Sequence, residues 1–253
     1  MNKEYLEQWL NVSESVNVQM PNEIFEDLSK AEFKSFNHKC FAYAYYYLIC
    51  YIYRNALYGG KTDQYSQQNI INVFTSDKSS VSYITKSKGI LDSMNYTKTT
   101  TDYPVSYYMD DGVLEFGLIK ELRMKIPELE MNHSPRFFVK EPLKATARFD
   151  REDYTGTFYS FQNTHKLDVE DFIKIISDKR LGHVGLYIYG YISMMCDKYN
   201  NKFQITNAQL GDFVGCSERT MKKYTQRLEE LNLVESTRII YDKKQLDKVY
   251  SII

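Results

Sequence analysis

The sequence feature that most constrains the fold is a pair of short amphipathic patterns near the C-terminal end, joined at a glycine. Thr206 and Gln209 have the spacing of a capping box, in which each side chain bonds the backbone amide of the other residue at a helix start. Apolar residues then recur with helical spacing at Leu210, Phe213 and Val214. Gly215 follows at the position where a helix ends and the chain turns. These residues predict a capped helix that stops at the glycine.

A second helix is predicted to begin directly after that turn, with Ser217 as its N-cap. Its apolar residues have 3, 4, 3 spacing and form one stripe of Met221, Tyr224, Leu228 and Leu231. The opposite face carries Arg219, Lys222, Lys223, Gln226 and Arg227. From Ser217 to Arg227 there are four basic residues and one acid, Glu218, so the helix has a charge of +3 in a chain with net charge -1. A local basic face of this kind favours an anionic partner, although the chain average hides it.

Strand-like sequence follows Leu233. The runs VESTRIIYD and KVYSII flank the polar segment DKKQLD and predict a β-hairpin with Lys243 and Lys244 at its tip. An almost entirely apolar helix is predicted over 182–199, before the two short helices. This order of helices, turn and hairpin resembles a winged helix-turn-helix domain, and the residues LGDFVGCSERTMKKYTQRLEELNLVES carry the resemblance. The alternative interpretation is a generic helical hairpin.

The resemblance implies that the basic helix enters the major groove of DNA. That groove admits one helix, in which Arg can bind guanine through two hydrogen bonds while Ser, Thr and Lys contact base edges or phosphates. The expected groove contacts are Ser217, Arg219, Thr220, Lys222, Lys223, Gln226 and Arg227. Lys243 and Lys244 of the wing are expected on phosphate or in the minor groove.

A weak internal repeat appears when the sequence is shifted by 140 residues. The segment SQQNIINVFTSDKSSVSYITKSKGIL, which starts at Ser66, then lies over the segment that starts at Thr206. Most apolar core positions coincide, but Lys88 falls on a leucine position. A long apolar helix over 38–58 precedes the segment, as the apolar helix over 182–199 precedes the other copy. The repeat predicts a second module of the same kind earlier in the chain.

This first winged helix is predicted over residues 35–120. Asp110, Asp111 and Gly112 lie between alternating apolar runs, which is a strong hairpin signal and supplies a wing. The recognition helix is expected between Asp77 and Lys88, with candidate DNA contacts at Lys78, Ser79, Ser80, Ser82, Tyr83 and Lys86. This face is less basic and richer in hydroxyl groups than its counterpart, so contact with DNA and a role in dimerisation both stay open.

The chain as a whole is predicted to be α+β and mainly helical, with two winged helix-turn-helix domains and small β-hairpin wings. Residues 1–34 are expected to form an N-terminal helical extension, and residues 168–253 the second winged helix. Residues 121–167, between the two winged helices, hold three of the five prolines and are predicted to be a linker.

Several functional classes are disfavoured by missing motifs. The four cysteines form no CxxC pair, the four histidines lack metal-binding spacing, and no glycine-rich phosphate loop is present. We therefore expect no metal, no cofactor, no catalytic residue and no enzymatic activity. The apolar run over 40–52 has 13 residues, whereas a membrane crossing needs about 20. A soluble, cytoplasmic protein without a membrane partner is expected.

Tyrosine is unusually frequent, with 23 residues in the chain. Six of them crowd the first long apolar helix, at Tyr43, Tyr45, Tyr46, Tyr47, Tyr51 and Tyr53. With 3.6 residues per turn, six such positions cannot all face one core. Because tyrosine is common at protein interfaces, some of these rings are expected to be exposed or to meet a second copy in a homodimer.

Tandem winged helices of about this total length resemble the replication initiator proteins of bacterial plasmids. The resemblance implies a sequence-specific protein of a plasmid or phage that binds double-stranded DNA, with a role in replication initiation. A transcriptional regulator that binds an operator needs the same groove contacts and is the alternative. A non-catalytic protein-interaction module is a further alternative, because winged helices also bind proteins.

Overall fold

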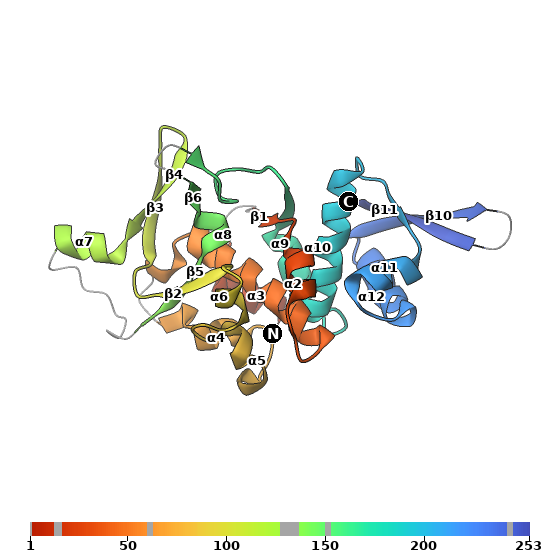
Figure 1. The fold of residues 1–253 in the computed structure, drawn as a ribbon, viewed down its shortest axis with the longest axis horizontal. Coiled ribbons are helices and arrows are strands. Elements are labelled where there is room, and N and C mark those ends of the chain that lie inside the picture. Colours follow the sequence, from red (N-terminus) through yellow and green to blue (C-terminus); the bar gives the residue numbers. More distant parts are fainter. Residues whose placement is uncertain (1, 13–16, 60–62, 127–136, 150–152, 242–244) are drawn as a thin grey trace. The chain divides into compact units, whose positions relative to one another are not determined.

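The computed structural model describes residues 2–12, 17–59, 63–126, 137–149, 153–241 and 245–253 (Figure 1). Internal contacts divide the chain into two compact units. The C-terminal unit comprises Met1–Asn17, Asn22–Tyr43 and Thr164–Ile253, and the central unit comprises Val18–Pro21 and Ala44–Asn163. Helices and small antiparallel sheets make up the described chain, which confirms the predicted α+β class. Across the described ranges, no helix combines the length and apolar character needed to cross a membrane.

The core of the C-terminal unit is built from helices with broad apolar surfaces. They are α1 (Lys3–Trp9), α2 (Ile24–Lys30), the first part of α3 (Phe36–Arg54), α9 (Val169–Ser177) and α10 (Gly182–Lys198), and the strand β8 (Thr164–Asp168) precedes α9. Every residue of α10 from Val184 to Ser193 is buried. A helix that is covered on all sides needs no polar face, which explains its almost entirely apolar sequence.

The segment of the C-terminal unit from Phe203 onward holds the two short helices and the hairpin predicted from the sequence. The elements are β9 (Phe203–Ile205), α11 (Asn207–Val214), α12 (Glu218–Glu230), β10 (Val234–Tyr241) and β11 (Gln245–Ile252). The three strands form an antiparallel sheet in the order β10-β11-β9, in which Val234 pairs with Ile252 and Tyr250 with Phe203. The two short helices and the hairpin are therefore present in the predicted order along the chain, and Figure 1 shows α11 and α12 beside this sheet.

The central unit alternates short helices with paired strands. It contains the second part of α3, the single turns η1 (Leu57–Gly59) and η2 (Asp63–Tyr65), α4 (Gln67–Asn72), α5 (Lys78–Thr85), α6 (Ile90–Ser93), β2 (Thr97–Thr100), β3 (Pro104–Asp110), β4 (Val113–Leu118), α7 (Ile119–Lys125), β5 (Val139–Pro142), α8 (Leu143–Thr146), β6 (Arg148–Phe149) and β7 (Asp153–Tyr154). The antiparallel pairs are β2–β5, β3–β4 and β6–β7. The short strand β1 (Asn17–Pro21) lies at the boundary of the two units in the sequence.

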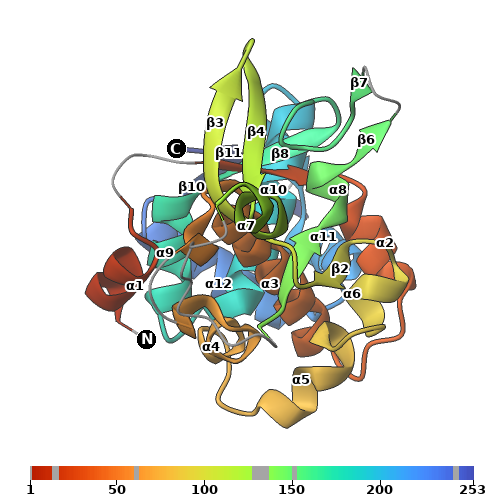
Figure 2. The same ribbon diagram turned by 90° about the vertical axis from the view of Figure 1, so that its left-hand side faces the viewer.

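The hairpin predicted at Asp110–Gly112 is present as β3 and β4, which run side by side in Figure 2. Asp110 pairs with Val113, so the loop has two residues. Asp111 has φ 47° and Gly112 has φ 81°, the positive angles that a type I′ turn requires. The Asp-Gly pair is used because glycine, and to a lesser degree aspartate, tolerates this backbone region.

The segment predicted as a linker, 121–167, contributes regular structure to the central unit. β5 pairs with β2 in an antiparallel register that sets Val139 opposite Thr100 and Pro142 opposite Thr97. Pro142 ends a strand that has one partner, a place where the missing backbone N–H costs no ladder hydrogen bond. The two compact units accordingly divide the chain differently from the predicted boundaries at 35–120 and 168–253.

The six tyrosines of α3 correct another expectation from the sequence. None of their side chains exposes more than 3% of its surface, so none is available for a partner subunit. In the C-terminal unit Tyr43 contacts Phe25 and Tyr187, and in the central unit Tyr53 contacts Phe116. Helical periodicity did not predict this burial, because α3, like α10, is buried around its circumference.

Candidate nucleic-acid interface

The helix α11 begins and ends as its sequence predicts. The Thr206 hydroxyl accepts a hydrogen bond from the Gln209 amide over 3.0 Å, and the Gln209 side chain accepts one from the Thr206 amide over 3.1 Å. Gly215 ends the helix with φ 90°, and its N–H donates to the carbonyl of Gly211. A left-handed residue at this place reverses the chain within a few residues, which sets α12 directly after α11.

The turn between α11 and α12 is also held from α3. The Lys39 ammonium donates to the carbonyl of Val214 over 2.7 Å, and it lies 5.4 Å from the ring centroids of Phe36 and Tyr187. Burial lowers the pKa of Lys39, and the two rings and the carbonyl compensate the buried charge. The turn between α11 and α12 is thereby fixed by a residue 175 positions away in the sequence.

Capping and burial determine which face α12 presents. The Ser217 side chain accepts from the Thr220 amide over 3.2 Å, and its hydroxyl lies 2.8 Å from that of Thr220. Met221, Thr225 and Leu228 are buried. The side chains of Arg219, Lys222 and Lys223 are exposed, and within the described part of the chain no ion pair engages them. The result is an uncompensated basic face at the N-terminal half of the helix.

Arg227, a predicted groove contact, lies in a different environment from these three residues. Its guanidinium bonds Asp178 through two nitrogens and Glu230 through a third, at 2.7 Å for the Glu230 contact. Partial burial acts to raise the pKa of Asp178, but hydrogen bonds from Arg227 and from the Arg180 amide outweigh it and lower the pKa. Arg227 therefore holds α12 against the turn before α10. Its guanidinium is engaged in ion pairs, unlike the exposed side chains of the three basic residues described above.

Gln226 is the remaining described residue of α12 that was predicted to contact the groove. Gln226 is exposed, and its amide donates to Glu230 over 3.4 Å. Lys243 and Lys244 lie outside the described residues. The hairpin itself is attached to α12 by Glu229, which accepts hydrogen bonds from Ser236 of β10 and, over 2.8 Å, from Lys248 of β11.

In the central unit the predicted contacts lie on and directly after α5. Asp77 caps the helix by accepting hydrogen bonds from the Ser79 hydroxyl and the Ser80 amide. The hydroxyl groups of Ser80 and Ser82 donate to backbone carbonyls of the preceding turn. Ser79, Ser82 and Lys86 are exposed, whereas Lys78, Ser80 and Tyr83 are partly buried. The hydroxyl-rich face thus uses much of its bonding capacity for the helix itself.

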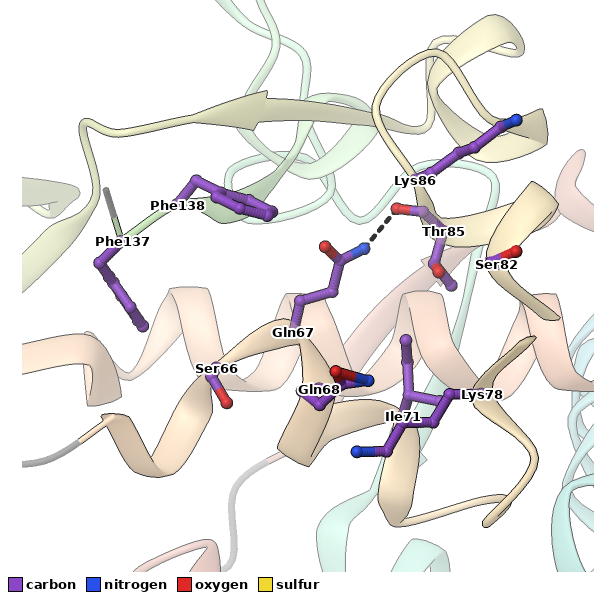
Figure 3. A pocket seen from close by; sticks show the side chains of 10 residues that line it. All are labelled: Ser66, Gln67, Gln68, Ile71, Lys78, Ser82, Thr85, Lys86, Phe137 and Phe138. Atoms are coloured by element: carbon purple, nitrogen blue, oxygen red, sulfur yellow. Dashed lines mark hydrogen bonds between the residues drawn. The ribbon is translucent and has the colours of Figure 1, made fainter. Parts of the chain in front are cut away.

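A cavity of about 410 Å³ lies beside this face, within the central unit (Figure 3). It is lined by Ser66, Gln67, Gln68, Ile71, Lys78, Ser82, Thr85, Lys86, Phe137 and Phe138. Three predicted contacts, Lys78, Ser82 and Lys86, are therefore brought together with residues that the sequence did not single out. Gln67 bonds the carbonyl of Thr85, which joins α4 to the end of α5. No sequence signal relates the phenylalanines to this helix pair, because they lie about 50 residues further along the chain.

Comparison with known proteins found no matching family model, no similar curated protein and no similar solved structure. The function of the chain therefore has to be inferred from the geometry and charge of its own residues.

Proposed function

We propose that the chain binds double-stranded DNA through its C-terminal unit, with the N-terminal half of α12 in the major groove. The observation that carries the proposal is the exposed set of Arg219, Lys222 and Lys223, whose charges no ion pair in the described chain compensates. Arg219 lies in the first turn of the helix, where a groove-bound helix meets base edges. Lys222 and Lys223 follow on the same exposed side and are assigned to phosphates.

The surrounding elements support the same proposal. The order α10, β9, α11, α12, β10 and β11, with the sheet order β10-β11-β9, is the arrangement expected of a winged helix. A turn fixed by Gly215 and Lys39 gives α12 one orientation relative to α11, which a helix that reads base edges requires. The hairpin β10–β11 supplies the wing, and its attachment to α12 through Glu229 keeps the two elements together.

We propose replication initiation on a plasmid or phage as the biological role, with operator binding by a transcriptional regulator as the alternative. The same groove contacts serve both roles, so the DNA target distinguishes them. Selection of bound fragments from a random or genomic library, followed by sequencing, identifies that target. Direct repeats near an origin support initiation, whereas a palindrome beside a promoter supports regulation by a twofold-symmetric dimer.

The DNA contact is tested by fluorescence anisotropy on the selected site and on random duplex. Arg219→Ala is expected to cost about 1–3 kcal/mol on the selected site and much less on random DNA, because a bidentate base contact carries sequence information. Lys222→Ala is expected to lower the affinity for both the selected site and random duplex. It is also expected to reduce the number of counterions released on binding by about one, as measured from the salt dependence of the affinity. Lys202→Ala, an exposed lysine between α10 and β9, is the matched control. Absence of duplex binding, or equal affinity of all variants, would refute the proposal.

A further inference from the structure

We propose that the central unit binds a nucleotide, one base with its phosphate, in the cavity between α4, α5 and Phe137–Phe138. The cavity volume of about 410 Å³ falls in the range of about 300–1,000 Å³ that small-molecule sites occupy. Its described lining combines aromatic rings, side-chain amides, hydroxyl groups and lysines (Figure 3). The inference does not rest on duplex binding by α12, because all of these residues belong to the other compact unit.

The charge of the lining selects for an anion. Lys78 and Lys86 are among the lining residues, and no carboxylate is present in the described lining. Figure 3 shows the Lys78 side chain extending back toward α4 and Gln68, whereas the Lys86 side chain extends away from Gln67. We assign Lys78 to the phosphate. No salt bridge within the described ranges engages this lysine, so its charge is available to a ligand.

The two phenylalanines have different environments. Phe137 is 9% exposed, and its ring centroid lies 5.3 Å from that of Tyr103 and 6.4 Å from that of Tyr58. Phe138 is 43% exposed and directs its ring toward the cavity. Phe137 therefore anchors the segment in the core, and Phe138 offers an uncovered aromatic face. Any of the nucleobases can stack on such a face, because every base has a π-face.

The polar residues supply partners for the edge of a base. A side-chain amide offers both a donor and an acceptor, the same combination that a nucleobase edge presents. Gln68 is exposed on α4 at the side of the cavity that Lys78 approaches. Gln67 is held by its bond to the Thr85 carbonyl. We accordingly assign Gln68 to the base edge. Gln67 is assigned a structural role, because its hydrogen bond holds α4 at a fixed distance from the end of α5.

The walls of the cavity are fixed by a buried lysine. The Lys140 ammonium donates to the Lys86 carbonyl over 3.1 Å, to Asp92 over 2.7 Å and to the Thr99 hydroxyl over 2.8 Å. Lys140 lies on β5, two residues after Phe138, and β5 pairs with β2. The end of α5 and the phenylalanine segment are thus tied to one point. A site preorganised in this way loses little entropy when a ligand binds.

The test is isothermal titration calorimetry on the full chain with AMP, adenosine and the tetranucleotide dT4 as probes. AMP is expected to bind, and adenosine is expected to bind more weakly because it lacks the phosphate. Tighter binding of dT4 than of AMP identifies a single strand as the source of the nucleotide, and the reverse order identifies the free nucleotide. Either order supports the site. Failure of both AMP and dT4 to bind overturns it.

Three variants locate the binding. Phe138→Ala is expected to lower the affinity for AMP by about 5- to 150-fold, the range found when a stacked aromatic is removed, and Phe138→Trp is expected to retain it. Lys78→Ala is expected to lower the affinity for AMP but to leave the affinity for adenosine unchanged. Lys120→Ala, an exposed lysine on α7 outside the cavity, is the charge-matched control.

Two outcomes contradict the assignment. Unchanged AMP affinity in both Phe138→Ala and Lys78→Ala places any binding elsewhere and overturns the site. Loss of AMP binding in Arg219→Ala, on α12, does so as well. Circular dichroism of each variant confirms folding, and Gln68→Ala on the exposed side of α4 provides a further probe of the cavity if Phe138→Ala does not fold. Duplex binding by α12 and nucleotide binding by this cavity can each fail without affecting the other.

Discussion

The hydroxyl of Tyr43 lies 2.7 Å from Nε2 of His165, and both side chains are fully buried in the C-terminal unit. Nδ1 of the same ring lies 2.9 Å from Oδ1 of Asn22. An amide oxygen accepts, so Nδ1 carries the proton, Nε2 accepts, and Tyr43 donates. Phe25 packs beside both rings, at 5.2 Å from Tyr43 and 5.3 Å from His165. The hydrogen bonds of His165 and the packing of Phe25 together join α2, α3 and β8 in one core.

Removal of the Tyr43 hydroxyl is expected to destabilise the C-terminal unit. Tyr43→Phe leaves Nε2 of His165 buried without its donor, which costs about 1–3 kcal/mol. The single tryptophan, Trp9, is buried in this unit, so its fluorescence during urea unfolding measures the loss. Tyr5→Phe, at a residue that is 48% exposed, is the control and is expected to leave the midpoint unchanged. Equal midpoints for the two variants would contradict the role of the bond.

The stability of the same unit is expected to fall as the solution is acidified. Burial lowers the pKa of His165 to about 3, while in the unfolded chain the pKa of histidine is about 6.5. Between these values the unfolded chain binds the proton and the folded chain does not, so stability decreases by up to about 1.4 kcal/mol per pH unit. Burial likewise lowers the pKa of His183, to about 4.

The measurement is a series of urea titrations between pH 7 and pH 4. In His165→Gln the pH slope is expected to be smaller than in the wild type, and part of it is expected to remain because His183 still titrates. An unchanged slope in this variant would show that His165 binds its proton equally well in the folded and the unfolded chain.

Gly190 on α10 is expected to be intolerant of alanine. A Cβ at this position would lie 2.0 Å from the Tyr43 hydroxyl oxygen. In an ordinary helix interior, Gly→Ala stabilises by about 1 kcal/mol, but here overpacking reverses the sign with a cost of about 1–3 kcal/mol. Thermal unfolding of Gly190→Ala, Tyr43→Phe and the double variant tests this. Because the clash involves the hydroxyl that Tyr43→Phe removes, the double variant is expected to lose less stability than the sum of the losses in the two single variants. Strict additivity would show that the two residues do not meet.

Lys140 is expected to be essential for the stability of the central unit. Its side chain is 1% exposed and pairs with Asp92, which is 12% exposed. Lys140→Met leaves the Asp92 charge without its cation, which costs about 3–5 kcal/mol when a buried pair is broken. The variant with both Lys140→Met and Asp92→Asn removes that charge, so its loss is expected to be smaller. Far-ultraviolet circular dichroism in urea gives the comparison, and a double variant less stable than Lys140→Met would disprove the pairing.

Arg219 and Arg227 on α12 are expected to behave differently. Arg219 is exposed, so Arg219→Ala is expected to lower duplex affinity without changing the thermal midpoint. Arg227 bonds Asp178 and Glu230, so Arg227→Ala is expected to lower the midpoint and to change specific affinity less. Paired melting and anisotropy measurements separate the two effects. The opposite ranking of affinities would assign the base contact to Arg227.

The parts of the fold that the sequence predicts are those governed by neighbouring residues. The capping box of Thr206 and Gln209, the left-handed Gly215 and the turn at Asp111–Gly112 all depend on local backbone geometry. Each is specified within four residues, and each is found where the sequence places it.

The parts that could not be predicted depend on residues far apart in the chain. Asp178 lies 49 positions from Arg227, so spacing along α12 gave no indication of their ion pair. β5 was not predicted, because a proline-rich segment is typical of a linker and its pairing with β2 is not evident from the sequence. The burial of the α3 tyrosines depends on how many elements surround the helix, and the spacing of residues within α3 contains no information on those elements. The cavity is missed for the same reason, since its lining spans Ser66 to Phe138.

The bond between Lys39 and the Val214 carbonyl has a consequence for the modularity of this protein. The turn that orients α12 is completed by a helix from the other end of the sequence, and Tyr187 of α10 stacks its ring beneath the same ammonium. A fragment that starts at residue 168 would keep both α11 and α12 but lose Lys39, and it would leave the Tyr187 side of α10 uncovered. The C-terminal unit therefore cannot be transferred as residues 168–253 alone, and any exchange of this unit must include the N-terminal helices that belong to it.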